Sequence, residues 1–302
     1  MGSFIRLRGR IVAAALAGTA LTAAMPAAQA QATVSGPQTI IVPCSTSALV
    51  TAINTGNSLS AATLVLPGNC TYTITTPATA SDGLPVITGH ISLVGGNNAA
   101  IRRSPVALTA FRILDVAVGG TLSLRGISVL NGSTSGLGGG ILNSGTLTLD
   151  HATLSGNRAG NGGGLANAAG ATASVSDTLI DANTTTGVGG GGIINSGTLT
   201  LATSTLSGNS APINGGGLNT QSAGTSSIIQ STIIHNVSGG LGGGISNLGH
   251  TSLYGAVVQL NEGSSGGGIA TGNTNVFLRS SFVVHNTPNN CNPLNTIQGC
   301  VN

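Results

Sequence analysis

Residues 138–157 read GGGILNSGTLTLDHATLSGN, and residues 190–209 repeat this stretch closely as GGGIINSGTLTLATSTLSGN. In both copies threonine alternates with leucine in the motif TLTL, a pattern typical of a short β-strand with one buried face. The glycine run that opens each copy is typical of a turn that needs a positive φ or a close approach of two backbones. The two copies therefore predict a unit of strands and turns that recurs along the chain.

The unit recurs well beyond these two copies, as an alignment on a single asparagine shows. The aligned series consists of Asn157, Asn183, Asn209, Asn236, Asn261 and Asn286, separated by 25 to 27 residues. Asn131 extends the series towards the N-terminus, although its neighbours fit better after a shift of one residue. An interval of this length is that of a solenoid coil, so the asparagines are predicted to stack inside as a ladder of hydrogen-bonded amides.

Three further positions of the unit carry an aliphatic side chain in every copy. One lies eight residues before the asparagine, one lies three residues before it, and one follows the glycine run directly. For Asn157 these residues are Leu149, Leu154 and Ile141. Each column becomes a buried stripe when successive coils stack. We therefore predict an all-β chain folded as a parallel β-helix solenoid with about 26 residues per coil.

The words GGG[IL] and [ST]xLSGN resemble the polymorphic outer-membrane protein repeat of bacteria, in which GGA[IL] is paired with FxxN. Over roughly residues 86–287 the chain is thereby similar to right-handed parallel β-helix proteins of the pectin-lyase-like architecture. The resemblance implies a right-handed solenoid. It implies no single function, because this scaffold carries lyases, hydrolases, adhesins and passive structural proteins.

The first 30 residues have the composition of a secretory signal peptide. Three arginines within residues 1–10 precede an apolar run at 11–25, and Ala28-Gln29-Ala30 supplies a small-x-small cleavage site. Cleavage is expected after Ala30, with Ala32 as the second choice and a retained signal-anchor as the remaining alternative. The chain is therefore predicted to be secreted and extracellular, and its alanine-rich signal favours a bacterial source.

Removal of the signal changes the charge balance. The full sequence has a net charge of +3, whereas residues 31–302 contain six arginines, no lysine and six acidic residues. No basic patch argues for a nucleic-acid partner, and no later segment is long and apolar enough to span a membrane. Ile, Leu and Val recur at regular positions, unlike in disordered chains, so the 49 glycines are attributed to turns.

Four cysteines remain after cleavage, and an even number in an exported chain is typical of disulfide pairs. Three pairings are possible. The pairing Cys44–Cys70 and Cys291–Cys300 is favoured because each pair is local and lies at one end of the repeats. This pairing predicts a disulfide at each end of the solenoid.

Both ends of a solenoid need a cap, because an open coil exposes strand edges and core. Residues 31–85 are predicted to form the N-terminal cap and first coil, with a short helix at 45–54 and the first strand region at 63–75. Residues 86–287 are assigned to the coils, and 288–302 to a C-terminal cap closed by a disulfide. No anchor of the kind found in surface-displayed β-helix proteins follows, which favours free secretion or loose wall association.

Four charged residues are expected to meet on the surface of neighbouring coils. His151 and Asp177 share one position of the repeat, Asp150 is adjacent, and Arg125 lies one coil earlier. Coils stack about 4.8 Å apart, so these side chains are predicted to form one cluster. Asp181 is expected on the same strand and the same face as Asp177.

Two interpretations of this cluster remain open. Pectate lyases of the similar fold hold calcium with carboxylates and use an arginine as base, and polygalacturonases use aspartates as acid and base, so the cluster is a candidate catalytic site. Alternatively it is a solvated salt-bridge ladder, worth at most about 1 kcal/mol per pair. We expect no metal and no cofactor, except calcium if the lyase alternative holds.

Other sites find little support. The glycine runs lack the lysine of a phosphate-binding loop, and His235 and His285 share a phase but lie two coils apart. Carbohydrate grooves usually offer aromatic platforms, whereas the mature chain has no tryptophan, two tyrosines and three phenylalanines. Later coils carry an apolar stripe of Ile234, Val257, Phe282 and Val284, which is either a partner surface or covered by turns and the C-terminal cap.

These observations predict a secreted, monomeric solenoid with a non-catalytic, adhesin-like or surface-interaction role. The expected partner is a polysaccharide or a cell-surface protein. The first alternative is a lyase or glycoside hydrolase acting on acidic, pectin-like polysaccharide. The second is a passive extracellular scaffold.

Overall fold

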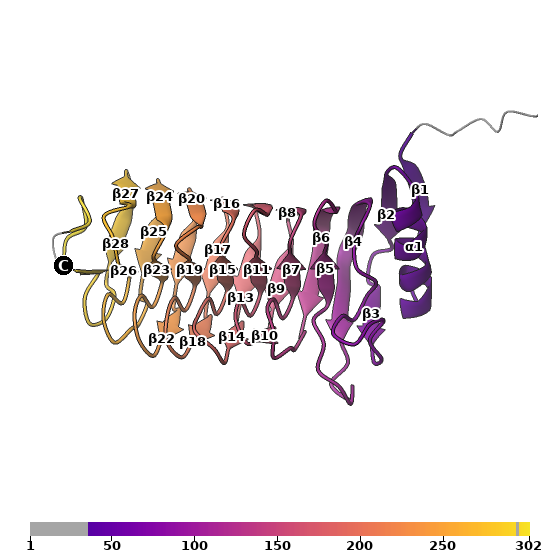
Figure 1. Ribbon diagram of the computed structural model, residues 1–302, viewed down its shortest axis with the longest axis horizontal. Coiled ribbons are helices and arrows are strands. Elements are labelled where there is room, and N and C mark those ends of the chain that lie inside the picture. The colour runs from indigo at the N-terminus through magenta and orange to yellow at the C-terminus, as the bar shows by residue number, and fades with distance from the viewer. Residues whose placement is uncertain (1–35, 294–295) are drawn as a thin grey trace, which may run out of the picture. The chain divides into compact units, whose positions relative to one another are not determined.

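A computed structural model describes residues 36–293 and 296–302 of the chain. The predicted signal peptide at 1–30 lies outside these residues. From Gly36 onwards the chain forms a parallel β-solenoid, in which strands of successive coils run side by side along the stack (Figure 1). The predicted all-β solenoid with about 26 residues per coil is therefore confirmed.

Within residues 36–293 and 296–302, the strands form three sheets in which neighbouring strands run parallel. The 17-stranded sheet comprises β1 (Gln38–Ile41), β2 (Ala62–Leu66), β3 (Thr71–Ile74), β4 (His90–Arg103), β6 (Thr121–Leu130), β8 (Thr146–Asp150), β9 (Thr153–Ser155), β12 (Thr172–Ser176), β13 (Leu179–Asp181), β16 (Thr198–Ala202), β17 (Thr205–Ser207), β20 (Thr225–Ile229), β21 (Thr232–Ile234), β24 (His250–Tyr254), β25 (Val257–Gln259), β27 (Val276–Arg279) and β28 (Phe282–Val284). The eight-stranded sheet comprises β5 (Leu114–Val116), β7 (Ile141–Asn143), β11 (Leu165–Asn167), β15 (Ile193–Asn195), β19 (Leu218–Thr220), β23 (Ile245–Asn247), β26 (Ile269–Thr271) and β29 (Cys291–Asn292). The four-stranded sheet comprises β10 (Arg158–Ala159), β14 (Thr184–Thr185), β18 (Ser210–Ala211) and β22 (Val237–Ser238).

Residues with positive φ make the corners of each coil. The corner that separates β8 from β9, and its equivalents in other coils, is formed by Gly126, His151, Asp177, Thr203, Gln230, Gly255 and Ser280. The bend at Asp177 places β12 before the corner and β13 after it. The expectation that Asp181 continues the strand of Asp177 is therefore wrong, because a left-handed residue interrupts that strand.

The glycine runs serve both purposes expected of them. Gly190 has a φ of 72°, a conformation that side chains disfavour. A Cβ atom on the next residue, Gly191, would lie 2.5 Å from the carbonyl oxygen of Gly216 in the following coil. The runs therefore allow both the turn and the close stacking of coils.

The three predicted aliphatic columns form the core. Leu149, Leu154 and Ile141 are fully buried, as are their equivalents in the following coil, Val175 and Ile180. The strand register aligns Leu149 with Val175 and Leu154 with Ile180. Burial of one such side chain contributes about 1.5–3 kcal/mol, so the repeated columns supply the main driving force for stacking.

The predicted asparagine ladder is confirmed and lies inside the coil. The Oδ1 atom of Asn209 accepts hydrogen bonds at 3.0 Å from both the backbone N–H and the Nδ2 group of Asn183. The Nδ2 group of Asn209 donates to the carbonyl oxygen of Ile180 and to Oδ1 of Asn236, both at 2.9 Å. The same pattern runs from Asn157 to Asn286.

Asn131 is not part of this ladder, and the position equivalent to the ladder asparagines is held in its coil by Gly132. The backbone N–H of Gly132 donates to Oδ1 of Asn157 at 2.8 Å, whereas Asn131 is exposed and has a φ of 61°. The shift of one residue seen in the sequence thus reflects a real change of register. Asn131 lies outside the ladder and makes the corner that precedes it.

A second ladder of amides was not predicted. Asn143 donates to Asn167, and Asn167 donates to Asn195, each from Nδ2 to Oδ1 at 2.8 Å. These three side chains are buried in the strands β7, β11 and β15. The repeated motif NSGT at 143–146 and 195–198 was the available signal, but the unequal spacing of the intervening Asn167 concealed it.

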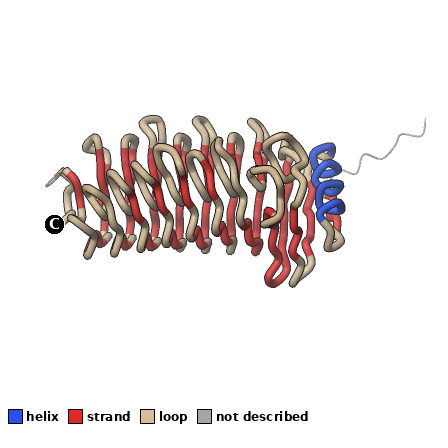
Figure 2. Tube along the Cα trace, turned by 90° about the horizontal axis from the view of Figure 1, so that it is seen from below, coloured by secondary structure: helices blue, strands red, loops and turns tan. Residues whose placement is uncertain are grey.

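One helix of the described chain, α1 (Thr46–Ser58), lies across the N-terminal end of the stack (Figure 2). Ser45 caps it, because the Ser45 hydroxyl accepts a hydrogen bond from the Ala48 N–H at 3.2 Å. Leu49 and Ile53 point inward and are fully buried. The helix thereby covers the open first coil, as the sequence predicts.

Two details of this cap differ from the expectation. The helix continues past residue 54 to Ser58, and its Gly56 packs closely on the first coils, where a Cβ would lie 3.0 Å from Ile91 Cδ1. The first strand is β1, which precedes the helix and pairs with β2. The segment at 63–75 supplies β2 and β3 instead.

Both predicted disulfides are present. The Cα atoms lie 5.7 Å apart in Cys44–Cys70 and 6.4 Å apart in Cys291–Cys300. The first joins the start of α1 to the start of β3, and the second closes the C-terminal cap. In the described part of the chain, no helix has the length and apolarity needed to cross a membrane.

Replacement of Asn209 by alanine is expected to lower the free energy of unfolding by about 2–4 kcal/mol. The substitution leaves the backbone N–H of Asn183 buried without an acceptor, which costs about 1–3 kcal/mol. It also removes one of the two acceptors of the Asn183 Nδ2 group, which keeps only the carbonyl oxygen of Leu154, and it removes the bonds that Asn209 donates to Ile180 and Asn236. Denaturant unfolding followed by circular dichroism measures the change. Ser207→Ala, on the outer side of the same coil, is the control, and equal stability of the two variants would contradict a stabilising ladder.

Candidate functional site

The four residues of the predicted charged cluster come from adjacent coils. Arg125 and Asp150 are Cα partners in β6 and β8, and Ser176 is the next partner in β12. His151 and Asp177 follow Asp150 and Ser176 at the equivalent corner of their coils, with φ of 50° and 47°. The structure therefore brings all four side chains to one rim of the solenoid.

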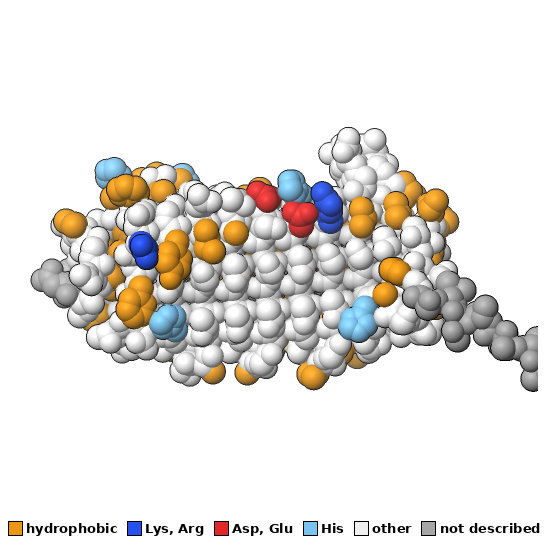
Figure 3. Space-filling model, turned by 90° about the horizontal axis from the view of Figure 1, so that it is seen from above, with side chains coloured by type: hydrophobic (Ala, Val, Ile, Leu, Met, Phe, Trp, Pro, Cys, Tyr) orange, Lys and Arg blue, Asp and Glu red, His pale blue; other side chains and the backbone are white. Residues whose placement is uncertain are grey.

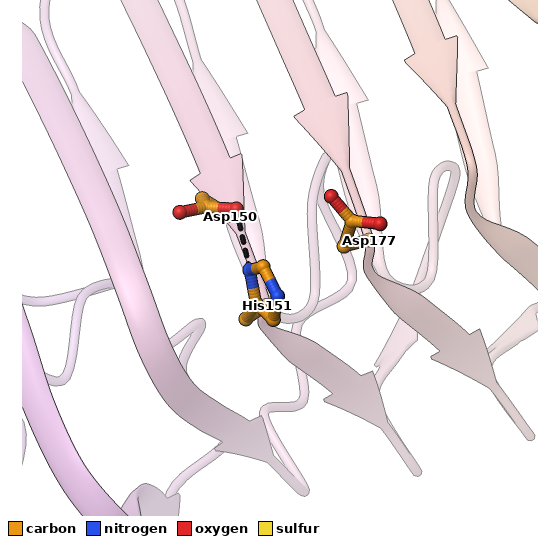
Figure 4. Close-up of side chains that lie close together, drawn as sticks. All are labelled: Asp150, His151 and Asp177. Atoms are coloured by element: carbon orange, nitrogen blue, oxygen red, sulfur yellow. Dashed lines mark hydrogen bonds and ion pairs between the residues drawn. The ribbon is translucent and has the colours of Figure 1, made fainter.

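Asp150 is the centre of this group. Its Oδ2 lies 3.2 Å from Nε of Arg125, and its Oδ1 lies 2.6 Å from Nδ1 of His151 (Figure 4). The side chains of Arg125 and His151 are 67% and 64% exposed, whereas that of Asp150 is 28% exposed. Both oxygens of the most protected carboxylate are thus already engaged by basic groups.

Asp150, His151 and Asp177 are also a group of potential metal ligands. One ligand atom from each lies within 4.8 Å of the others. Calcium takes about six to eight oxygen ligands, and two carboxylates with an imidazole fall far short of that set. Zinc accepts such nitrogen and oxygen ligands, but the guanidinium of Arg125 beside Asp150 repels a cation there.

The arrangement of these four side chains fits a surface salt-bridge ladder better than a catalytic pair of carboxylates. Both oxygens of Asp150 are paired, and Arg125 is one of its ion-pair partners, so neither residue is free to act as a base. Asp177 is exposed at the corner. A catalytic role for Arg125, Asp150, His151 and Asp177 stays a prediction.

A buried ion network in the first coils was not predicted. Nε of Arg112 lies 3.1 Å from Asp82, and its Nη1 lies 3.4 Å from Asp115. Asp82 is held further by Thr79, whose hydroxyl donates to Oδ2 at 2.6 Å, and by Ser81 at 3.1 Å. Asp82 and Arg112 are 4% and 8% exposed. The network joins the loop before β4 to the strand β5, which bears Asp115. Its three residues do not occupy equivalent positions of the repeat, so the sequence does not indicate that they meet.

Burial raises the pKa of Asp115 above its ordinary value. Arg112 opposes this change and lowers the pKa, while the nearby Asp82 raises it. The carboxyl group of Asp115 therefore holds a proton more tightly in the folded chain than in the unfolded chain.

A flat array of hydroxyl groups is a second candidate site that the sequence analysis did not single out. The threonine column consists of Thr121, Thr146, Thr172, Thr198 and Thr225, aligned by the strand register. The mixed column, two residues further along each strand, consists of Ser123, Thr148, Ser174, Thr200 and Ser227. We call these ten residues the hydroxyl face. Its sequence signal was the motif T-x-[ST] at the start of each strand.

The hydroxyl face is open to solvent and uncharged. Each of its residues is exposed or half-buried. Figure 3 shows regular rows free of charged and hydrophobic side chains across the middle of this side of the solenoid, with hydrophobic side chains towards both ends and a group of acidic, basic and histidine side chains at one rim. His90 and His250 flank the threonine column in the register at its two ends.

The hydroxyl groups of this face are not used by the protein itself. In residues 36–293 and 296–302, none of the ten side chains hydrogen-bonds to another protein group. By contrast, the corner hydroxyls of Thr178, Ser204 and Ser231 donate to backbone carbonyl oxygens at 2.7, 2.7 and 2.8 Å. The ten free hydroxyls are therefore available to a ligand.

The apolar stripe predicted for the later coils is short and interrupted. Phe282 is 65% exposed, whereas Ile234, Val257 and Val284 are half-buried. Val257 lies beside Phe282, but Gln259 separates Ile234 from Val284 in the neighbouring column. The exposed apolar surface here centres on Phe282.

No family model matches the chain, and searches of curated proteins and of solved structures find no significant match to it. The resemblance carried by GGG[IL] and [ST]xLSGN is thus one of short motifs. The solenoid itself is established by the strand pairing.

Asp150→Asn combined with Asp177→Asn is expected to change the free energy of unfolding by less than about 1 kcal/mol, because exposed ion pairs contribute little. Denaturant unfolding measures the change. Asp82→Asn, which breaks the buried pair with Arg112, is expected to cost about 3 kcal/mol or more. Comparable losses in the two variants would contradict this assignment of a surface ladder and a buried network.

The raised pKa of Asp115 predicts a pH dependence of stability. The folded state binds the proton of Asp115 more tightly than the unfolded state does. The stabilisation of the folded state by this proton is therefore complete below the ordinary aspartate pKa, and it is lost as the pH rises through the raised pKa. The difference in unfolding free energy between wild type and Asp115→Asn should therefore fall with pH in the window just above 3.8. Thermal or denaturant unfolding across that window measures it, with Ser207→Ala as a variant without a titrating change. A difference that rises with pH would contradict the assignment.

Proposed function

We propose that this protein is a secreted, non-catalytic surface-interaction protein with an adhesin-like role. One observation carries the proposal: ten free hydroxyl groups stand in two straight columns on an uncharged face. A surface of this kind suits an extended, repetitive ligand better than a small molecule, since small-molecule sites are usually concave.

Export is part of the proposal. Disulfides persist in oxidising compartments, and this chain uses all four of its cysteines in two of them. The signal sequence expected at 1–30 supports the same location. The short motifs shared with right-handed β-helix proteins of bacterial surfaces support both a bacterial source and an exported solenoid.

The protein is proposed to act as a monomer. Both ends of its coil stack carry caps tied by disulfides, which discourages end-to-end pairing of strands. The partner is proposed to be a solid or polymeric surface outside the cell, such as a polysaccharide or a cell-surface component.

A second candidate function rests on the gathering of Arg125, Asp150, His151 and Asp177. Two carboxylates with basic neighbours could serve a lyase or glycoside hydrolase acting on acidic, pectin-like polysaccharide. The double engagement of Asp150 weighs against it. A passive extracellular scaffold is the remaining alternative, and it requires no free surface groups.

The test uses the mature, oxidised protein and a panel of insoluble polysaccharides, intact cells and ice. Retention on each surface is scored together with new reducing or unsaturated ends, in calcium and in chelator. We expect retention on at least one surface without product, because the hydroxyl face binds and does not react. Thr172→Lys with Thr198→Lys should abolish retention, whereas Asp150→Asn with Asp177→Asn should leave it unchanged.

Calcium-dependent product that disappears in the Asp150→Asn, Asp177→Asn variant would replace this proposal by the lyase alternative. Absence of retention on every surface would leave only the passive scaffold.

A further inference from the structure

The hydroxyl face is periodic in two directions. Neighbouring strands in a sheet lie about 4.8 Å apart, so each column repeats at that distance from coil to coil. The two columns are two residues apart along each strand, which corresponds to about 6.7 Å. The ten side chains thus form a rectangular lattice of hydroxyl groups, about 19 Å long for the five coils of the threonine column.

The lattice is rigid as well as regular. The second amide ladder fixes the start of these strands, because Asn143 and Asn167 donate from Nδ2 to the backbone carbonyl oxygens of Thr172 and Thr198 at 2.9 and 3.1 Å. Threonine is stiff at χ1 because its Cβ is branched. All five residues of the threonine column are threonine, although serine would supply the same hydroxyl group. Threonine has fewer accessible rotamers than serine, so the position of each hydroxyl oxygen is more restricted.

The free hydroxyls set the chemistry of the ligand. Each hydroxyl offers one donor and two acceptor positions. A water molecule in ice both donates and accepts hydrogen bonds, so a hydroxyl can take the place of one of its neighbours. The face has no charge, so an ionic polymer gains nothing from it. It also has no aromatic side chain on which a sugar ring could stack.

A crystalline array of water meets these conditions. Oxygen atoms on the prism faces of hexagonal ice repeat in two perpendicular directions at distances similar to the two spacings of the hydroxyl face. A single hydrogen bond exchanged with water contributes little, about 0.5–1.5 kcal/mol, so only many contacts in register can hold a protein on such a surface. The threonine methyl groups between the hydroxyls add apolar contact that favours exclusion of disordered water.

We propose that the hydroxyl face binds ice. The inference rests on the proposed surface-interaction function and names its ligand as crystalline water. Ice contacts the threonine and mixed columns together, and His90 and His250 mark the ends of the threonine column.

The test is uptake of the mature, oxidised protein into a slowly growing ice hemisphere, together with thermal hysteresis and inhibition of ice recrystallisation. Wild type is expected to enter the ice and to show both activities. Thr172→Lys with Thr198→Lys places two charged side chains in the middle of the lattice and is expected to abolish all three effects. Thr153→Lys with Thr205→Lys changes half-buried threonines of β9 and β17, on the outer side of the sheet beyond the corner, and is expected to retain all three effects.

Circular dichroism and thermal unfolding establish that each variant is folded. Should the lysine variant be unstable, Thr172→Ala with Thr198→Ala removes the hydroxyls and the methyl groups without adding charge, and it should weaken ice uptake in the same direction. Exclusion of the wild type from ice, or full activity of the folded lysine variant, would overturn the inference.

Failure of this inference can be told apart from failure of the proposed function. Retention on insoluble polysaccharide or cells that requires Thr172 and Thr198, without uptake into ice, would overturn the ice assignment and support the surface-interaction role. Absence of binding to ice and to every other surface would overturn both.

Discussion

The structure depends on the buried asparagine amide that joins each coil to the next. At the corner before β10 and its equivalents, the backbone leaves the long sheet and its strand pairing is broken. The Asn209 side chain completes the missing bonds there, because it connects to Asn183, to Asn236 and to the carbonyl oxygen of Ile180. A solenoid coil contacts only its neighbours, so a bond repeated in each coil from Asn157 to Asn286 adds to the stability that the aliphatic columns give this part of the stack.

The same constraint accounts for the unusual composition. Close stacking at the corners requires glycine where a Cβ would meet the carbonyl oxygen of the next coil, as at Gly191. Successive coils also bring identical positions side by side, so a repeated charge would face itself at about 4.8 Å. The long columns are therefore uncharged, and where two charges do face each other in neighbouring coils, as Arg125 and Asp150 do at the rim, they are opposite. The periodic hydroxyl face is a consequence of this arrangement, and it is the feature on which the proposed function rests.

Features that recur at a regular interval were the most predictable from the sequence, although the second amide ladder, with its unequal spacing, and the hydroxyl face were missed. The solenoid, the aliphatic columns and the Asn157–Asn286 series follow from spacing, and the disulfide pairing was favoured because each pair is local and lies at one end of the repeats. The network of Asp82, Arg112 and Asp115 lies in irregular coils, where no repeat phase reports which residues meet. The meeting of Arg125, Asp150, His151 and Asp177 was predictable because coil stacking superimposes repeat positions. The separation of Asp177 from Asp181 was not, because a left-handed corner on a residue other than glycine leaves no clear mark in the sequence.

The most direct measurement of the central claim is hydrogen exchange of the asparagine side-chain amides, followed by NMR on the mature protein. Asn183, Asn209 and Asn236 are fully buried, whereas Asn54 and Asn97 are exposed. The ladder predicts that the side-chain amide protons of the first three exchange only when coils separate, and therefore far more slowly than those of Asn54 and Asn97. Equal exchange rates in the two groups would show that the amides do not join the coils, and would contradict the account of the fold and of its regular surface.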